Sequence, residues 1–369
     1  MTSKNVLIAM TLTFLLLLVV FALRAQAARP SVAQITDDWF ASGHADAKSL
    51  PFTYWNDTDP PAVPVECATC HSYYGFMDYL GVDGSTAGKI DQEAKTGSVL
   101  YCNTCHNPAA PSYKTVEFPS GVKLSNLGPE AACVTCHHGL ESTVSVNKVI
   151  AGKPLDVPLE KQGFINPHYF PAAATQAGGL VQGAYQYDGQ TYVGRFEHTT
   201  TMRTCNQCHD PHSLEIDPKT CSPCHSNVVT VRDLRDVRQS KVDYDGDGNL
   251  TEGIAYELDA YGERLLRAIQ LYAAEKLGTP IAYNEAAYPY WFIDTNNNGI
   301  ADGSESIFPN QYTLWSPRLL RATYNYQFAH KDPGGFVHNA KYLMQVTYDT
   351  LSDLGQAVTV DMSGLLRPQ

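Results

Sequence analysis

The sequence predicts a mainly α-helical fold with much irregular loop, a short β-hairpin and a helical C-terminal part. Glycine and proline are plentiful, with 27 and 22 copies, which is typical of a loop-rich chain. Aromatic residues alternate with polar ones over residues 185–193 around Asp188-Gly189, and this pattern predicts the hairpin. From about residue 236 onward cysteine is absent and apolar residues recur at helical spacing.

The first 27 residues are predicted to be a leader that takes no part in the fold. Lys4 supplies a positive charge, an apolar run extends from Val6 to Leu23, and the small residues Ala25 and Ala27 stand where a signal peptidase would cleave. The apolar run is also long enough for an uncleaved N-terminal membrane anchor, which is the alternative. Both interpretations place the rest of the chain outside the cytoplasm, in the periplasm or beyond the cell.

All ten cysteines fall within five Cys-x-x-Cys-His motifs. The motif residues are Cys67, Cys70 and His71; Cys102, Cys105 and His106; Cys133, Cys136 and His137; Cys205, Cys208 and His209; and Cys221, Cys224 and His225. Two thiols at this spacing can form thioethers with the two vinyl groups of one haem, and the adjacent histidine then reaches the iron. Zinc sites, redox pairs and disulfide frameworks also use paired cysteines, but none of them requires a histidine after every second cysteine. We therefore predict five covalently bound haem c groups.

Seven histidines lie outside the motifs, which is more than five irons need for a second axial ligand. We predict bis-histidine ligation with the distal iron ligands His44, His168, His198, His212 and His338. His138 directly follows a motif histidine and could serve only a neighbouring haem, and His330 lies near a helix end where it could face solvent. The second-choice ligands are Met77, Met202 and Met344.

The chain is predicted to divide into a leader or anchor (1–27), a pentahaem cytochrome c domain (28–235) and a helical domain with EF-hand-like loops (236–369). An apolar stripe predicts the first helix of the last domain; it consists of Ile254, Leu258, Tyr261, Leu265, Ala268, Ile269, Tyr272 and Leu277. A second helix is expected from Pro317 toward His330 and a third from about His338 to Leu354. We interpret these stripes as core packing.

Two acidic loops in this last domain have the spacing of calcium-binding loops. In residues 294–305 the calcium ligands expected of an EF-hand are Asp294, Asn296, Asn298, Ile300 through its backbone carbonyl, Asp302 and Glu305, with Gly299 at the turn. A second loop opens in the same way with Asp243, Asp245, Asp247 and Asn249. Its twelfth position is Ile254, so Glu252 or Glu257 would have to complete it. The alternative is a pair of acidic turns that cap helices. We predict one or two structural Ca²⁺ ions.

The formal net charge of −12 restricts the classes of partner. Haem propionates would make the protein more acidic still, which argues against nucleic acid as a partner. A basic redox protein or a metal cation is easier to accommodate.

Taken together, the motifs and their flanks resemble bacterial multihaem (pentahaem) c-type cytochromes of respiratory and extracellular electron transfer. The segments that carry the resemblance are Ser42-Gly43-His44-Ala45-Asp46, residues 164–170 around His168, residues 194–198 ending in His198, residues 208–212 ending in His212, and residues 331–339 around His338. The likeness covers most of residues 38–354. It supports the five chosen distal histidines over His138 and His330, and it implies electron transfer.

We predict an electron carrier rather than a catalyst. The first alternative is a multihaem oxidoreductase with one open haem that reduces a nitrogen or sulfur oxyanion, which needs a free iron position. No motif has an altered proximal residue, and the histidines suffice to close every iron. The second alternative is a structural haem subunit, either of a membrane redox complex or of a cytochrome filament formed by self-association.

Overall fold

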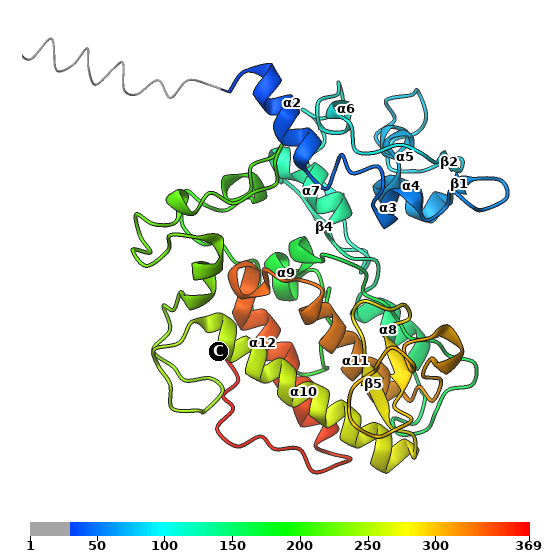
Figure 1. The fold of residues 1–369 in the computed structure, drawn as a ribbon, viewed down its shortest axis with the longest axis vertical. Coiled ribbons are helices and arrows are strands. Elements are labelled where there is room, and N and C mark those ends of the chain that lie inside the picture. The colour runs from blue at the N-terminus through cyan, green and yellow to red at the C-terminus, as the bar shows by residue number, and fades with distance from the viewer. Residues whose placement is uncertain (1–29) are drawn as a thin grey trace, which may run out of the picture.

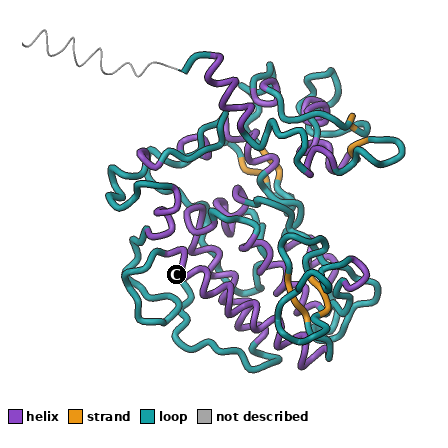
Figure 2. The backbone as a smooth tube through the Cα atoms, in the orientation of Figure 1, coloured by secondary structure: helices purple, strands orange, loops and turns teal. Residues whose placement is uncertain are grey.

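The computed structural model describes residues 30–369 as helices joined by long loops, with three small pairs of antiparallel strands (Figures 1 and 2). This confirms the predicted mixture of helix and irregular loop. The predicted leader or anchor at residues 1–27 lies outside the described residues. Within residues 30–369, no helix is both long enough and apolar enough to cross a membrane.

The N-terminal part, drawn at the top of Figure 1, consists of short helices and two strand pairs. The helices are α2 (Val32–Ala41), α3 (Leu50–Thr53), α4 (Val65–His71), α5 (Tyr73–Tyr79), α6 (Cys102–Cys105) and α7 (Ala131–Cys136). Strand β1 (Ala62–Val63) pairs with β2 (Ala94–Lys95), and β3 (Val116–Glu117) pairs with β4 (Lys123–Leu124). The first three motifs lie on α4, α6 and α7, where residues three apart share one face of the helix. Both cysteines of each of these motifs are therefore directed to the same side.

The middle of the chain connects the motifs through short elements. These are η1 (Gly128–Glu130), α8 (Thr143–Ile150), α9 (Ala172–Ala177), η2 (Gly178–Leu180), η3 (Cys205–Gln207), η4 (Pro218–Thr220) and η5 (Val231–Asp236). The fourth motif begins in the 3-10 turn η3, and the fifth directly follows η4.

The C-terminal part is built on three long helices that pack against one another in the lower half of Figure 1. They are α10 (Ile254–Leu277), α11 (Pro317–His330) and α12 (Gly335–Leu354), accompanied by the strand pair β5 (Ile281–Tyr283) and β6 (Trp291–Ile293) and by η6 (Phe308–Asn310). All three predicted helices are confirmed. Ser316 caps α11 by accepting a hydrogen bond from the backbone N of Leu319, and Pro317 occupies the first turn, where its missing N–H costs nothing.

The largest apolar cluster buries the stripe predicted on α10. Tyr261, Leu265, Ile269 and Tyr272 are all fully buried and pack with α11 and α12. The same cluster takes in apolar residues of α8 and of the segment that follows it, so residues before 236 also pack onto the long helices. The domain boundary near residue 235 stays a prediction.

Arginine side chains on α11 form a buried ionic network with α12. The two guanidinium groups of Arg318 and Arg321 share the carboxylate of Asp353, which lies 2.8 Å from Arg321 Nη2. Arg318 Nε also lies 2.7 Å from Asp156 in the loop after α8. Asp353 is thus the largely buried anion shared by both cations, and Asp156 pairs with Arg318 alone, so the network fixes α12 against α11.

The prediction of a β-hairpin at residues 185–193 is wrong, because this segment forms no strands. Its backbone groups bond to side chains of the long helices and of α8. Tyr185 N donates to Asn325 Oδ1 at 2.6 Å, Asn325 Nδ2 donates back to Tyr185 O at 2.9 Å, and Val193 N donates to Gln345 Oε1 at 2.8 Å. Since a backbone N–H has one proton to donate, the N–H groups of Tyr185 and Val193 are no longer available for a cross-strand ladder. The alternating aromatic residues reflect packing against helices.

Candidate haem sites

All ten motif cysteines are free thiols in the structure. Cys102, Cys105 and Cys224 are exposed, and the other seven are partly buried. The ten are therefore available for thioether bonds, and no disulfide competes for them.

Each motif histidine faces one histidine from another part of the chain. The distances between ring centroids are 5.7 Å for His71 and His168, 6.2 Å for His106 and His212, 6.5 Å for His137 and His44, 6.4 Å for His209 and His338, and 5.9 Å for His225 and His198. An iron held between two imidazole nitrogens would separate the ring centres by about 6 Å, given a metal–nitrogen bond of about 2 Å and roughly 1 Å from nitrogen to ring centre on each side. The spacing of all five pairs fits an iron bound by both rings.

The partner histidines come from loops and helix ends that are distant in sequence from the motifs they face. His44 lies in the loop after α2, and its backbone O accepts from Leu100 N at 3.1 Å, just before the second motif. His338 lies in the first turn of α12, where Asn339 has a non-helical backbone that separates this turn from the rest of the helix. His212 lies in the loop that follows the fourth motif, yet its ring stacks with His106 of the second at an interplanar angle of 7°.

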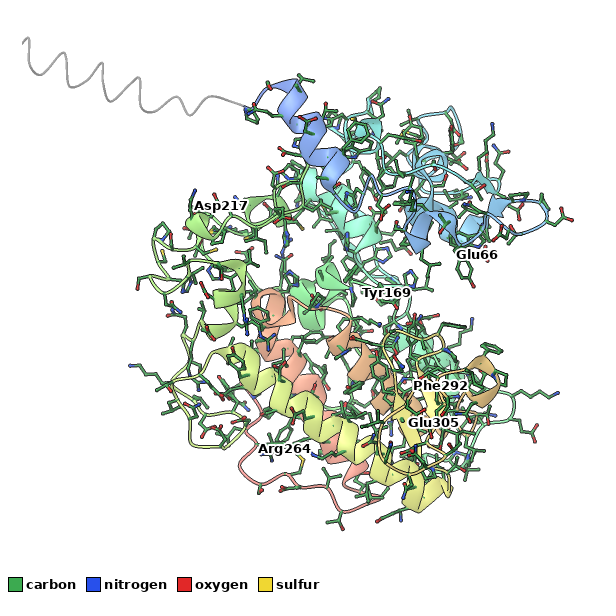
Figure 3. All side chains as sticks on the ribbon, in the orientation of Figure 1. Glu66, Tyr169, Asp217, Arg264, Phe292 and Glu305 are labelled. Carbon is green, nitrogen blue, oxygen red and sulfur yellow. The ribbon has the colours of Figure 1, made fainter. Side chains whose placement is uncertain are left out.

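His168 is held in a strained backbone conformation. Its φ of +75° lies in the left-handed region, which residues other than glycine rarely adopt. Asn166 Oδ1 stabilises the turn by accepting from His168 N at 2.9 Å and from Gln327 Nε2 on α11 at 2.8 Å. Next to it, the ring of Tyr169, labelled in Figure 3, carries the Lys331 ammonium 4.0 Å from its centroid. Contacts to α11 and its C-terminal end therefore aim His168 at the first motif.

Hydrogen bonds at Nδ1 orient several rings of the five pairs. Backbone carbonyl oxygens accept from His71 at Pro51 (2.9 Å), from His137 at Phe170 (3.3 Å) and from His209 at Leu214 (3.2 Å). A carbonyl can only accept, so Nδ1 carries the proton in these rings and Nε2 is left as the metal-binding nitrogen. His338 differs, because its Nδ1 contacts a carboxylate, that of Asp332.

Burial keeps two of the partner rings, those of His44 and His168, neutral, as metal binding requires. Burial, followed by the charge of His137, lowers the pKa of His44 to about 4. Burial and the charge of His71 lower the pKa of His168 to about 4 in the same way. At neutral pH both rings are therefore unprotonated and able to act as ligands.

The two histidines outside the pairs, and two of the three second-choice methionines, have other contacts. His138 Nδ1 lies 2.5 Å from the backbone O of Gly139, and its ring packs on Phe118. His330 Nε2 lies 2.8 Å from Glu285, and its ring stacks on Tyr326. Met77 and Met344 are buried in separate apolar clusters. The contacts of these four side chains are therefore with groups other than the motif histidines.

Cysteines of different motifs lie close together. Cys70 Sγ lies 3.7 Å from the backbone O of Thr135 in the third motif, and the proximity of the Cys70 and Cys136 thiols lowers the pKa of Cys70 and raises that of Cys136. Cys133 and Cys205 share the equivalent contact between the third and fourth motifs, which lowers the pKa of Cys133 and raises that of Cys205. The third motif therefore adjoins both the first and the fourth.

The second and fifth motifs adjoin this central group. Although Cys105 is exposed as a residue, desolvation of its thiol, followed by the charge of Cys133, raises the pKa of Cys105 to about 11. Burial, followed by the charge of Cys221, raises the pKa of Cys208, so the fourth and fifth motifs are also neighbours. The buried carboxylate of Glu130, three residues before the third motif, accepts from Cys205 N at 3.2 Å and from Arg195 Nη2 at 2.6 Å. No pattern in the sequence marks Glu130, so its place between the third and fourth motifs was not predicted.

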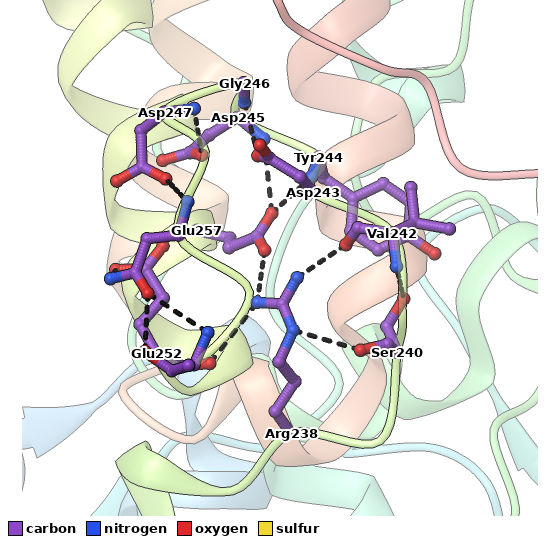
Figure 4. A network of polar contacts seen from close by, with 12 residues as sticks. Arg238, Ser240, Val242, Asp243, Tyr244, Asp245, Gly246, Asp247, Glu252 and Glu257 are labelled. Carbon is purple, nitrogen blue, oxygen red and sulfur yellow. Dashed lines mark hydrogen bonds and ion pairs between the residues drawn. The ribbon is translucent and has the colours of Figure 1, made fainter.

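The acidic loop at 243–254 brings three carboxylates together. Within residues 30–369, Asp243, Asp245 and Asp247 form the only group of three potential metal-ligating side chains whose ligand atoms all lie within 4.8 Å of one another. Figure 4 shows how Glu257 is occupied: it forms an ion pair with Arg238 and accepts from the backbone N of Tyr244 and of Asp245.

Glu252 is the remaining carboxylate beside this group. Its Oε1 is buried without a hydrogen-bond partner. Burial, followed by the charges of Asp247 and Asp245, raises the pKa of Glu252. Of the two residues considered for completing this loop, Glu252 is thus the one not already engaged by a cation.

The acidic loop at 294–305 is closed by its own hydrogen bonds. Asp294 accepts from Asn298 N at 3.1 Å and from Gly299 N at 2.7 Å. Glu305, which is buried, accepts from the backbone N of Thr295 at 2.7 Å and from its hydroxyl at 2.6 Å. The carboxylates at the first and last positions of the loop therefore point inward, as the predicted spacing requires.

The five motifs, placed on helix ends and loops that keep them in contact, define a multihaem c-type cytochrome. The chain is 24% identical over 89% of its length to the C-type polyheme cytochrome OmcC of Geobacter sulfurreducens (strain ATCC 51573 / DSM 12127 / PCA), and it covers 47% of that protein. It is also 24% identical over 83% of its length to the C-type polyheme cytochrome OmcB of strain DL-1 / KN400, covering 46% of it. The chain thus spans about half the length of the curated relatives it matches. No family model matches the chain, and no solved structure matches it.

Proposed function

We propose that this protein transfers electrons through five covalently attached haems with bis-histidine ligation, outside the cytoplasm. One observation carries the proposal: each of the five motif histidines faces a different one of the five histidines predicted as distal ligands, at ring-centroid distances of 5.7 to 6.5 Å. Bound haem would supply the redox centre, while the chain supplies attachment, spacing and ligation.

The contacts between motifs support a conduit. Neighbouring motifs lie close together at their cysteines: the first is near the third, the third is near the second and the fourth, and the fourth is near the fifth. Thioether bonds at these positions would hold the haem edges near one another. The chain would thereby place five redox centres in one contiguous group. Cysteines that would attach the haems are exposed at the second and fifth motifs, where electrons could enter or leave.

The competing function is a haem oxidoreductase, which needs one iron with an open position. The one-to-one pairing of rings leaves no motif histidine without a partner ring among the described residues. We therefore favour the carrier. Its partners would be redox proteins, and assembly into a membrane redox complex or a filament is the further alternative.

We expect the purified protein to contain five haems that are all low-spin and do not bind CO. Intact mass under denaturing conditions and the pyridine haemochrome give the haem count, and EPR with CO titration gives the spin state. Replacing Cys102 and Cys105 with serine should remove one haem, since serine cannot form the thioether bonds, and both cysteines are exposed, so the change leaves the core untouched. A high-spin, CO-binding haem in the unmodified protein would contradict the carrier and support the oxidoreductase.

We also propose that the two acidic loops bind structural Ca²⁺. Three converging carboxylates repel one another unless a cation neutralises them, and Ca²⁺ takes six to eight oxygen ligands. In the loop at 243–254, Glu252 would complete the site. In the loop at 294–305, the site would be formed by the oxygens of Asp294, Asn296, Asn298, Ile300, Asp302 and Glu305.

We expect removal of calcium to lower the thermal unfolding midpoint. When the free Ca²⁺ concentration is 100 times the dissociation constant, binding stabilises the folded chain by about 2.7 kcal/mol. The Asp245→Asn and Glu252→Gln variants should each lose one bound Ca²⁺ per chain, measured by elemental analysis after dialysis. Asp188→Asn is the matched control, because Asp188 precedes a turn glycine but belongs to neither loop. Unchanged calcium content in both loop variants would contradict the site at 243–254.

A further inference from the structure

Among residues 30–369, the buried carboxylate of Asp332 has no lysine or arginine partner. Its side chain is only 1% exposed, and within this part of the chain its one ion-pairing partner is the imidazole of His338. Both carboxylate oxygens lie within reach of His338 Nδ1, at 2.8 and 2.9 Å. The neighbouring ammonium of Lys331 points away, toward Glu285 O and the rings of Tyr169 and Tyr290. A buried anion needs a positive charge nearby, and a neutral imidazole alone does not supply one.

The backbone around Asp332 is shaped for this contact. Asp332 Oδ1 also accepts from Gly334 N at 3.2 Å, and Asp332 O accepts from Gly335 N at 2.9 Å. Asp332 is therefore the first residue of a tight turn that these two hydrogen bonds close. A Cβ on Gly334 would lie 2.6 Å from His338 Cε1, so only glycine lets the ring lie over this turn. The ring is thus held between the carboxylate at Nδ1 and His209 of the fourth motif, 6.4 Å away between centroids.

None of the other nine rings in the five pairs contacts a carboxylate in the part of the chain that the structure describes. Where Nδ1 has a protein acceptor in those rings, the acceptor is a backbone carbonyl, as for His71, His137 and His209. A carboxylate draws the Nδ1 proton more strongly than a carbonyl does, and this makes the ligating nitrogen a stronger donor. The added negative charge and the stronger donor both favour the ferric over the ferrous state.

We infer that Asp332 is a positioning residue that lowers the reduction potential of the haem held by Cys205, Cys208, His209 and His338 below the value set by ligation alone. This inference rests on the proposed bis-histidine ligation. With this lowered potential, the haem of the fourth site would be the last to be reduced among haems of otherwise equal ligation and burial. Because this motif lies near both the third and the fifth, the lowered potential would fall on a haem in the middle of the group.

The test is a spectroscopic redox titration of the holoprotein and the Asp332→Asn variant. Asparagine keeps the size and can still accept at Nδ1, so the fold and the low-spin state should persist. One of the five components should shift to a more positive potential by clearly more than the other four, because Asp332 contacts the ring of His338 directly and reaches that of His137 only through its charge. Glu285→Gln is the control, because it removes the same charge from His330, which faces no motif histidine. No shift in any component, or an equal shift in the control, overturns the inference.

His338→Gly separates this inference from the proposed ligation. The glycine variant should leave one haem iron without its distal ligand, which appears as one high-spin signal. The redox component that changes should be the same one that Asp332→Asn shifts. If His338→Gly leaves every haem low-spin, the proposed ligation is at fault. If it opens one haem while Asp332→Asn shifts none, the ligation stands and the role of Asp332 is only that of a turn-capping side chain.

Discussion

Replacing His168 with glycine is expected to convert one of the five haems from low-spin to high-spin and to let it bind CO. The ring of His168 lies 5.7 Å from that of His71 and has no other motif histidine beside it. Glycine suits the test because the backbone at this position has a φ of +75°, which glycine adopts without strain. The variant therefore removes the ligand while sparing the fold. EPR and CO titration would measure the change.

Added imidazole should restore the low-spin spectrum of the glycine variant by occupying the vacated position. His138→Ala is the matched control, since His138 is also partly buried and near the motifs but faces none of their histidines. It should leave all five haems low-spin. If the glycine variant keeps five low-spin haems, or if the His138 control opens one, then the pairing of His71 with His168 does not describe ligation.

Replacing Asp353 with alanine is expected to cost about 3–5 kcal/mol of folding stability, because it leaves two buried arginines without their shared anion. Arg318 and Arg321 both pair with this carboxylate, and their side chains are 5% and 10% exposed. Each guanidinium would then repel the other in a poorly solvated site. The loss would appear in denaturant unfolding followed by the helical signal in circular dichroism.

Asp259→Ala on α10 provides the comparison. Asp259 also pairs with an arginine, Arg235, but its side chain is 55% exposed. Exposed pairs contribute about 0–1 kcal/mol, so this variant should remain close to the parent protein. Equal losses in the two variants would mean that the network between α11 and α12 contributes no more than a surface ion pair.

Part of the fold was predictable because its signals are local. The apolar stripe from Ile254 to Leu277 has the period of a helix, and α10 occupies those residues. Pro317 after Ser316 indicated the start of α11 for an equally local reason. The hairpin prediction failed because hydrogen bonds from Asn325 and Gln345, more than a hundred residues away, decide the backbone of residues 185–193. A window of alternating residues carries no information about such partners.

The sequence by itself determined the chemistry of this protein: five motifs use every cysteine, and their spacing is that of haem attachment. It also supplied the set of candidate distal histidines. Only the tertiary structure decided which of them faces which motif, since His44 meets His137 and His338 meets His209 across long stretches of chain. The pairing of distant rings depends on how loops and helices pack, and residue spacing along the chain does not encode it. The same holds for Asp332, whose contact with His338 depends on a turn that places a buried carboxylate against the ring.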